Sequence, residues 1–399
     1  MSSLLLEGIR VLDFTQFLAG PYCGMFLADM GAEVIKIENL KGGGDFTRGA
    51  RPREPKTNRS MYFGNLNRNK KSVCIDLKTA EGKELFAELV KSADVLLENN
   101  RPGVMAKLGF GYEDCKKMNP AIIYASISGF GQYGPYSERP GYDLIAQAMG
   151  GSMSITGWDG QEPTRAGMAI GDLFAGLNAC IGIVSSLYKR KETGLGQSID
   201  VSLMDSIVSG MEAKMMQYVH GGQIPEKTGN RYLASAPYDS FRAADDDFVV
   251  ASGTDAHFVV LAKAMGMPEL SDDPRFLKTE GRLNNQAELK EIINGWAGQR
   301  TAKECVDIIL GAGIPAGPIY NVKQVFEDEH MKAREMFVTV NHKDAGELTV
   351  IGNPIKMSEY PVQYRKAAPD AGEDDFEIFE ALGFSRETLE KYREMGAMM

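Results

Sequence analysis

Apolar and polar positions in the first 130 residues alternate between short apolar runs and longer stretches with helical spacing. Residues 21–30 and 79–93 have helical spacing, and Gly31 ends the first of these helices. The alternation predicts a largely parallel, doubly wound α/β sheet. The runs typical of its buried strands are GIRVLDF (8–14), AEVIKIE (32–38), KSVCIDL (71–77), ADVLLEN (93–99) and AIIYASISGF (121–130).

The longest amphipathic stretch spans residues 172–191, where apolar side chains recur at three- and four-residue steps, as one buried helical face requires. Basic residues at 189–191 suit the negative end of the helix dipole. The sequence TGLG (193–196) ends the helix, and SIDVSLMDS (198–206) is read as a strand leading into another helix. This segment therefore continues the α/β pattern.

Beyond about residue 220 the pattern changes to a strand at 247–254 followed by helices at 257–266, 288–298 and 302–313. A chain of 399 residues also exceeds what one hydrophobic core usually serves. We therefore predict two domains, the second smaller than the first. The predicted boundaries are 1–220 for a large Rossmann-like domain, 221–325 for a small α/β domain, and 326–399 for a C-terminal segment that returns to the large domain.

The composition is that of a globular enzyme, and the formal net charge of −10 disfavours nucleic-acid partners, which need a broad basic surface. There is no run of about 18 uncharged apolar residues and no signal-peptide pattern at the N-terminus, so we expect a cytoplasmic protein without a membrane partner. The five cysteines are scattered and never form a C-x-x-C pair, which favours reduced core residues over disulfides or zinc ligands.

The sequence lacks the short motifs of several classes of functional site. The glycines at 42–44 follow a strand but do not open a helix, so a loop is favoured over a dinucleotide site. P-loop, H-E-x-x-H, G-x-S-x-G and kinase signatures are absent. The four histidines share no ligand-like spacing, so no metal site is expected.

Basic and amide side chains gather in the loops that follow the predicted strands between residues 36 and 107. Ligands of open α/β sheets lie at these carboxyl ends, and arginines there could hold phosphates of a small anionic ligand. A solvated charged surface is the alternative for each residue taken alone. The set comprises Arg48, Arg51, Arg53, Asn67, Arg68, Asn69, Lys70, Lys71, Asn99, Arg101 and Lys107.

Asp172 stands directly before the apolar period of the long helix and has two readings. It could be the N-cap of that helix, accepting a hydrogen bond from a free amide. It could instead be a nucleophile, because amides and dipole at a helix start would hold a carboxylate ionised. The sequence pattern alone favours the cap.

Six ordered segments resemble the class III CoA-transferases of the CaiB/BaiF family, and together they span nearly the whole chain. They include VLDFTQFLAGPYCGMFLADMGAEVIKIE (11–38), ISGFGQYGPYSERPGYDLIAQAMGG (127–151) and GIPAGPIYNVKQVFEDEHMKAREMF (313–337). The others are residues 65–86, 94–113 and 165–206. The resemblance implies a Rossmann-like large domain, a smaller domain and an interlocked homodimer whose sites draw on both chains.

The resemblance also implies an activity, which is transfer of coenzyme A (CoA) from an acyl-CoA thioester to a free carboxylic acid. Asp172 would be the nucleophile and would pass through a mixed anhydride and an aspartyl-CoA thioester, with no metal or redox cofactor. It implies CoA contacts from Asn99, Arg101, Lys107, Tyr142 and the segment Ile75, Asp76, Leu77 and Lys78. It places Gln16, Leu18 and Asp143 in the substrate pocket.

Three departures from the oxalate-specific members of that family bear on the substrate. Leu18 stands where those enzymes have glutamine, and LASAPY (233–238) stands where they have a glycine lid. Asn39 replaces a CoA-contacting arginine, for which Lys41 and Arg48 are possible substitutes. The segment at 215–232 is closer to the carnitine branch, so we expect a carnitine-type or hydroxy-acid-type substrate rather than oxalate.

Two other functions stay open from the sequence. An acyl-CoA racemase of the same superfamily needs an acid and base pair, and its relatives carry G-H-D where this chain has Gly141-Tyr142-Asp143. A tyrosine, with a usual pKa near 10, is a poor base at neutral pH. A catalytically silent CoA-binding protein, in which Asp172 only caps its helix, is the third hypothesis.

Overall fold

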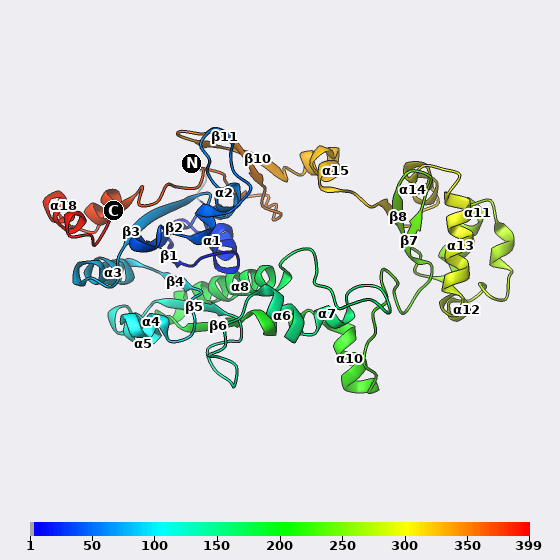
Figure 1. The fold of residues 1–399 in the computed structure, drawn as a ribbon, viewed down its shortest axis with the longest axis horizontal. Coiled ribbons are helices and arrows are strands. Elements are labelled where there is room, and N and C mark those ends of the chain that lie inside the picture. The colour runs from blue at the N-terminus through cyan, green and yellow to red at the C-terminus, as the bar shows by residue number, and fades with distance from the viewer. Residues whose placement is uncertain (1–3) are drawn as a thin grey trace. The chain divides into compact units, whose positions relative to one another are not determined.

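The structure, a computed structural model, describes residues 4–399 and divides into two compact units (Figure 1). Unit 1 contains the chain up to Ser154 together with Arg165–Pro225 and Lys332–Met399. Unit 2 contains Ile155–Thr164 and Glu226–Met331. The sequence placed residues 155–164 in the large domain, but they pack in unit 2. Chain continuity suggested the first assignment, whereas packing decides the second.

Unit 1 is built on a six-stranded sheet in the order β3-β2-β1-β4-β5-β6, with every neighbouring pair parallel. This confirms the predicted doubly wound α/β class. The strand order reverses between β1 and β4, which is where ligands of such sheets bind. The strands are β1 (Arg10–Phe14), β2 (Glu33–Asn39), β3 (Lys70–Ile75), β4 (Val95–Glu98), β5 (Ile123–Ser128) and β6 (Ser198–Ser202).

Successive strand residues point to opposite faces, so the sheet has two apolar cores. Val11 and Leu97 join the core under α1 (Ala19–Asp29), α8 (Ile170–Thr193) and α9 (Leu203–Ser209). Leu12 and Leu96 join the core under the helices of the other face. These are α3 (Ala80–Ser92), α5 (Tyr112–Met118), α17 (Asp375–Ala381) and α18 (Arg386–Glu394).

Helix α8 is the predicted long amphipathic helix, extended by two residues at each end. It packs against α1, and Gly176 permits the close approach, because a Cβ there would lie 2.6 Å from the carbonyl oxygen of Ala19. By length and composition alone α8 could also cross a membrane, a test that core helices of soluble proteins pass as well. We assign it to the core because Ala175, Ala179 and Ile183 are buried against the sheet.

Shorter helices complete the first part of unit 1, namely α2 (Met61–Leu66), α4 (Val104–Leu108), α6 (Asp143–Met149), α7 (Ser152–Ile155) and α10 (Glu212–Gly221). The C-terminal part adds the antiparallel hairpin of β10 (Phe337–His342) and β11 (Gly346–Ile351). The end of the chain lies beside β3, where Met398 forms a bridge with Ile75. All five cysteines are free and buried, as the sequence predicts.

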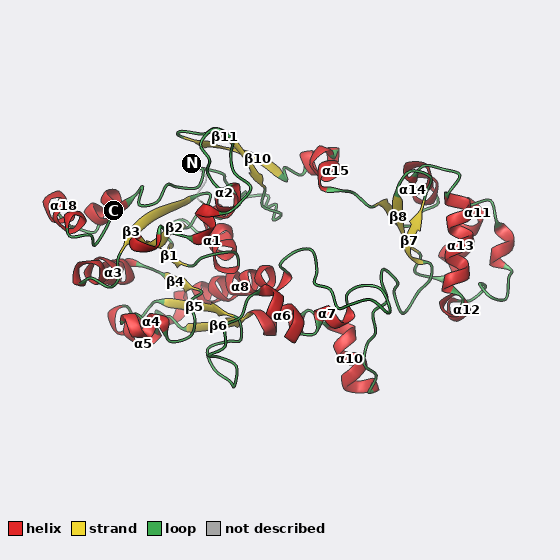
Figure 2. Cartoon of the chain, in the orientation of Figure 1, coloured by secondary structure: helices red, strands yellow, loops and turns green. Residues whose placement is uncertain are grey.

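Unit 2 has its own apolar core, formed between a three-stranded antiparallel sheet and several helices (Figure 2). The strands, in the order β7-β8-β9, are β7 (Tyr238–Arg242), β8 (Asp247–Ala251) and β9 (Ala316–Pro318). The helices that supply core residues are α11 (Asp255–Ala264), α13 (Gln286–Ala297) and α14 (Ala302–Gly311). Further helices are α12 (Thr279–Asn284), α15 (Val322–Glu327) and α16 (Glu329–Ala333).

Candidate active site

A cavity of about 340 Å³ opens in unit 1 at the carboxyl ends of β1, β4 and β5. This is the position at which a doubly wound sheet binds ligands. The loops after these three strands form much of its wall, and residues 139–144 form another side. Tyr62, Asp172 and Leu203 complete the lining, so helices α2, α8 and α9 also contribute.

Asp172 lies in the first turn of α8 and is not its cap. The N-cap position belongs to Ala169, whose side chain makes no capping hydrogen bond. Within residues 4–399 the carboxylate of Asp172 accepts no hydrogen bond, although it lines the cavity. The cap interpretation of Asp172 was therefore wrong. It failed because the helix begins two residues earlier, at Ile170, so that Asp172 already lies inside its first turn.

The charge state of Asp172 also differs from the expectation. Burial, followed by the negative charge of Asp143, raises the pKa of Asp172 from 3.8 to about 7. The helix start does not hold this carboxylate fully ionised, because desolvation outweighs the stabilisation that a dipole gives. At neutral pH the side chain is divided between its acid and its ionised form.

Asp143 performs the capping role that the sequence gave to Asp172. Its Oδ1 accepts a hydrogen bond of 2.9 Å from the backbone N–H of Gly171, in the first turn of α8. Its Oδ2 accepts one of 2.7 Å from Nε2 of Gln147, one turn later in α6. Asp143 is thus fixed beside Asp172 by two donors from different elements.

The loop after β1 is held by buried charged and polar groups. The Thr15 N–H donates to Asp13, and the carbonyl oxygen of Thr15 accepts a bond of 2.8 Å from Nζ of Lys36. Asn99 holds the backbone of Gln16, the residue after Thr15, with two hydrogen bonds. Oδ1 of Asn99 accepts from the Gln16 N–H, and Nδ2 of Asn99 donates to the Gln16 carbonyl oxygen. The Gln16 backbone thus engages both polar atoms of the predicted CoA ligand Asn99.

Aromatic rings stand at one side of the same loop. Phe17 has a φ of 68°, an unfavourable value for a side chain of that size. Its ring centroid lies 5.5 Å from that of Phe46 and 5.9 Å from that of Tyr142. Leu18, the residue that replaces glutamine, follows and faces the cavity. This wall of the site is therefore apolar.

Two arginines line the cavity without a carboxylate partner. Among the described residues, neither Arg101 nor Arg139 forms an ion pair, and the guanidinium of Arg139 stacks 3.9 Å from the ring centroid of Tyr136. Asn99 and Asn100 lie on the same wall as Arg101. Uncommitted guanidinium groups beside amides are suited to binding carboxylate or phosphate oxygens.

The structure gathers six of the predicted site residues around this cavity, namely Leu18, Asn99, Arg101, Tyr142, Asp143 and Asp172. Gln16 joins them only through its backbone bonds to Asn99. Lys107 is exposed on α4 and does not line the cavity. The same holds for Lys78 after β3.

The other members of the predicted segment 75–78 face inward. Ile75 and Leu77 belong to the apolar core, where their side chains cannot contact a ligand. Asp76 is buried and its carboxylate lies 2.7 Å from Nζ of Lys41. Arg48, the other suggested substitute for the missing arginine, is paired with Glu38 and is not free. Only Lys78 and backbone groups of this segment remain available for CoA.

Among the residues of the site that were not predicted from the sequence, three bear most on its chemistry. Tyr62 and Arg139 line the cavity, and Gln147 is buried behind Asp143. Arg139 could have been suspected, since it is a basic residue three positions before Tyr142 in a loop that follows a predicted strand. Gln147 could not have been recognised from the sequence, because a glutamine in a helix looks the same in the sequence whether it is buried or exposed.

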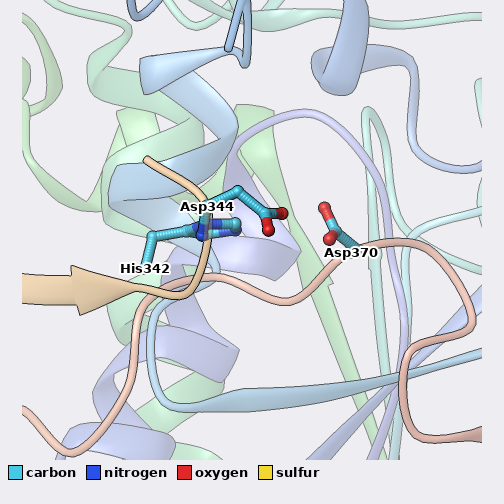
Figure 3. Close-up of side chains that lie close together, drawn as sticks. All are labelled: His342, Asp344 and Asp370. Carbon is cyan, nitrogen blue, oxygen red and sulfur yellow. The ribbon is translucent and has the colours of Figure 1, made fainter. Parts of the chain in front are cut away.

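A second cluster lies elsewhere in unit 1, where His342, Asp344 and Asp370 point toward one another (Figure 3). Their ligand atoms are close enough for a metal ion. However, the guanidinium of Arg59 lies 2.9 Å from Asp344 and 2.7 Å from Asp370, and Nζ of Lys343 lies 3.2 Å from Asp370. These cations already balance the carboxylates, so the cluster is an ion-pair network of the hairpin.

The fold and the cavity define a Rossmann-like protein that presents a half-buried carboxylate and two arginines without ion pairs to an anionic ligand. The sequence profile of CoA-transferase family III matches residues 6–375. A succinyl-CoA–D-citramalate CoA-transferase of Chloroflexus aurantiacus is 39% identical over 386 residues, with 96% of each chain covered. A succinyl-CoA:mesaconate CoA-transferase of Haloarcula hispanica is also 39% identical, covering 95% of this chain and 96% of its own.

A crystal structure of a CaiB/BaiF family protein from Brucella suis superposes with a TM-score of 0.87 at 36% identity. It covers 96% of this chain and 100% of the other. The chain belongs to CoA-transferase family III, the CaiB/BaiF family. It is an enzyme that transfers CoA between acyl-CoA and carboxylic acid substrates.

Proposed function

We propose that the protein transfers CoA through a covalent intermediate on Asp172. The observation that carries this proposal is the Asp172 carboxylate, which lines the cavity and accepts no hydrogen bond from any described residue. A nucleophile needs an accessible lone pair. Asp143 also lines the cavity, but each of its oxygens already accepts a hydrogen bond, which lowers its nucleophilicity.

The reaction balances without a cofactor. An oxygen of Asp172 attacks the thioester carbonyl of the donor, the C–S bond breaks, and CoA leaves as a thiolate while a mixed anhydride of Asp172 and the donor acid remains. The thiolate attacks the Asp172 carbonyl, which releases the donor acid and leaves an aspartyl-CoA thioester. The acceptor carboxylate repeats these steps in reverse. Thioester exchange is nearly neutral in free energy, so the site must mainly position the groups and exclude water.

The environment of Asp172 fits this role in two ways. A carboxylate with a pKa near 7 is more basic than an ordinary aspartate and hence a stronger nucleophile once ionised. Around neutral pH a substantial fraction is ionised at any time. The rate of the first step should therefore rise with pH through about 7.

For the substrate we propose an acid with a second negative group, such as a dicarboxylic acid or its hydroxylated form. The two relatives above act on citramalate and mesaconate, both dicarboxylic acids. Arg101 and Arg139 could pair with a far carboxylate, whereas they would repel the quaternary ammonium of carnitine. Of the two substrate types expected from the sequence, a hydroxy acid is thus favoured over carnitine.

The rest of the site and assembly follows the family resemblance. We propose that CoA is bound near Asn99, Arg101 and Tyr142, with Lys78 and Lys107 reaching its phosphates. We also propose an interlocked homodimer in the cytoplasm, acting with no metal or redox cofactor. Tyrosine at position 142, in place of a basic histidine, gives racemisation no support.

Asp172→Asn tests the proposal. Asparagine is close in size and cannot form the anhydride, so we expect a folded protein whose transfer rate falls at least about 1,000-fold. The measurement is transfer from succinyl-CoA to a panel of dicarboxylic and monocarboxylic acids, read by mass spectrometry. Hydroxylamine added during turnover should convert Asp172, and no other residue, to a hydroxamate. A fully active Asn variant would contradict the nucleophile.

The matched control is Asp159→Asn, which makes the same change at an exposed position of unit 2. It should leave the rate unchanged. The panel also tests the substrate class. Transfer to monocarboxylic acids at the rate of dicarboxylic acids would remove the proposed role of the two arginines.

A further inference from the structure

Gln147 is a fully buried polar side chain that does not line the cavity. Its Oε1 accepts a hydrogen bond of 2.9 Å from the backbone N–H of Ala166. Its Nε2 donates at 2.7 Å to Oδ2 of Asp143 and, more weakly, at 3.4 Å to the carbonyl oxygen of Met168. One amide therefore joins helix α6 to the segment that leads directly into α8.

These partners fix the orientation of the amide. The N–H of Ala166 requires an acceptor, so Oε1 must face it and Nε2 must face Asp143. The second oxygen of Asp143 receives the N–H of Gly171. Each oxygen of Asp143 thus accepts one hydrogen bond from an N–H donor, one from the first turn of α8 and one from Gln147.

We propose that Gln147 is a positioning residue, which holds the Asp143 carboxylate against the first turn of α8 and so sets the place and the charge of Asp172 in the cavity. The role rests on the proposed function, because it presumes that Asp172 is the nucleophile. Gln147 touches no reacting atom and acts only through Asp143 and residues 166–168.

Several charged or titratable groups face Asp172 in this site. Asp143 comes from α6, Tyr142 precedes it, and Tyr62 comes from α2. Arg101 and Arg139 lie on the loops after β4 and β5. After burial, the charge of Asp143 is the other cause that raises the pKa of Asp172. A change in how Asp143 is held should therefore appear in the pH dependence of transfer.

The test is a double-mutant cycle between Gln147→Met and Asp143→Asn. Methionine has nearly the shape of glutamine but cannot donate to Oδ2 of Asp143, so the Asp143 carboxylate is no longer held in place beside Asp172 and its repulsion of the Asp172 charge weakens. We expect kcat to fall about tenfold or more, with KM for the acyl-CoA within about threefold. The acid limb of the pH profile should move down by about half a unit or more.

Asp143→Asn should move the acid limb in the same direction, because it removes the charge directly. If Gln147 acts through Asp143, then adding Gln147→Met to Asp143→Asn should produce no further movement of the limb. Two independent, additive shifts would overturn the proposal. So would a Gln147→Met enzyme with wild-type kcat and acid limb.

Controls separate folding, position and function. Gln299→Met makes the same substitution at an exposed position of unit 2 and should leave kcat and the pH profile unchanged. Circular dichroism and thermal unfolding check that each variant is folded. If Gln147→Met does not fold, Gln147→Asn replaces it in the cycle, since asparagine is too short to reach both partners and has the same expected outcomes.

The outcome for Asp172→Asn distinguishes this proposal from the proposed function. An active Asp172→Asn enzyme would remove the nucleophile and the positioning role together. An inactive one, combined with unchanged kinetics of Gln147→Met, would remove the positioning role alone.

Discussion

Asp172 shows how competing effects of known size decide the state of one residue. A position in the first turn of a helix stabilises a carboxylate by about 0.3–1 kcal/mol. A rise in pKa from 3.8 to about 7 corresponds to about 4 kcal/mol against the charged form. Burial, reinforced by Asp143, is thus the larger effect. The reactivity of the site is obtained at the expense of local stability.

A stability prediction follows from the sign of this shift. The folded pKa lies above the unfolded value, so the folded state holds a proton that the unfolded state releases between about pH 4 and pH 7. The titration of Asp172 therefore lowers the stability of the wild-type protein as the pH rises through this range. Asp172→Asn lacks this contribution. We expect the variant to be more stable by about 1–2 kcal/mol at pH 8, below the 4 kcal/mol ceiling because Asp172 is partly open to the cavity.

Urea unfolding of both proteins at pH 5 and pH 8 measures this difference. The advantage of the variant should be smaller at pH 5, where most wild-type molecules carry the proton in the folded state. Equal stability of the two proteins at pH 8 would contradict the raised pKa.

At the scale of elements, the loop after β1 depends on charges buried under the sheet edge. Burial disfavours the charged form of Lys36, yet the carboxylates of Asp13 and Asp45 outweigh burial and raise the pKa of Lys36. Nζ of Lys36 lies 2.8 Å from Asp45 and bonds the carbonyl oxygen of Thr15. Lys70 reaches Asp13 at 2.7 Å from β3. Buried ion pairs between Lys36 and Asp45 and between Lys70 and Asp13 therefore stabilise the loop that carries Phe17 and Leu18.

Removing one member of this network should be costly. Lys36→Met leaves Asp45 and the Thr15 carbonyl without their buried cation, so we expect a loss of about 3–5 kcal/mol in the free energy of unfolding. The control is Lys71→Met on the neighbouring strand β3, because Lys71 is partly exposed and pairs with Glu33. Its loss should stay below about 1 kcal/mol. Denaturant titration of both variants measures these losses. A loss for Lys36→Met as small as that for Lys71→Met would contradict the stabilising role of the buried ion pairs.

At the scale of the whole molecule, the packing of the single chain does not explain why the outer side of α8 exposes apolar side chains. Phe174, Ile181, Val184 and Tyr188 form an apolar stripe, and the side chains of Ile181 and Tyr188 are 65% and 71% exposed. Exposed apolar stripes of this kind are typical of interfaces. The stripe supports the proposed homodimer, in which a second copy would cover it.

Ile181→Glu should weaken that assembly. A charge in the middle of a covered apolar stripe has to be desolvated, so we expect sedimentation velocity to show the variant as a monomer at concentrations where the wild-type protein sediments as the proposed dimer. Lys117→Glu, an exposed change on α5 at the other face of the sheet, is the control and should stay dimeric. A dimeric Ile181→Glu protein would place the interface elsewhere.

The sequence by itself determined the six strands of the large sheet, the long helix, the doubly wound class and the family, since each depends on local periodicity or on ordered segments. It also singled out Asp172. Tertiary structure alone decided that Asp143, 29 positions earlier, caps α8, and that burial together with the charge of Asp143 raises the pKa of Asp172. It decided as well that Gln147 holds Asp143 and that Ile75 and Leu77 are core residues. Periodicity reports which face of an element is buried, whereas partners distant in sequence are set by how the elements pack.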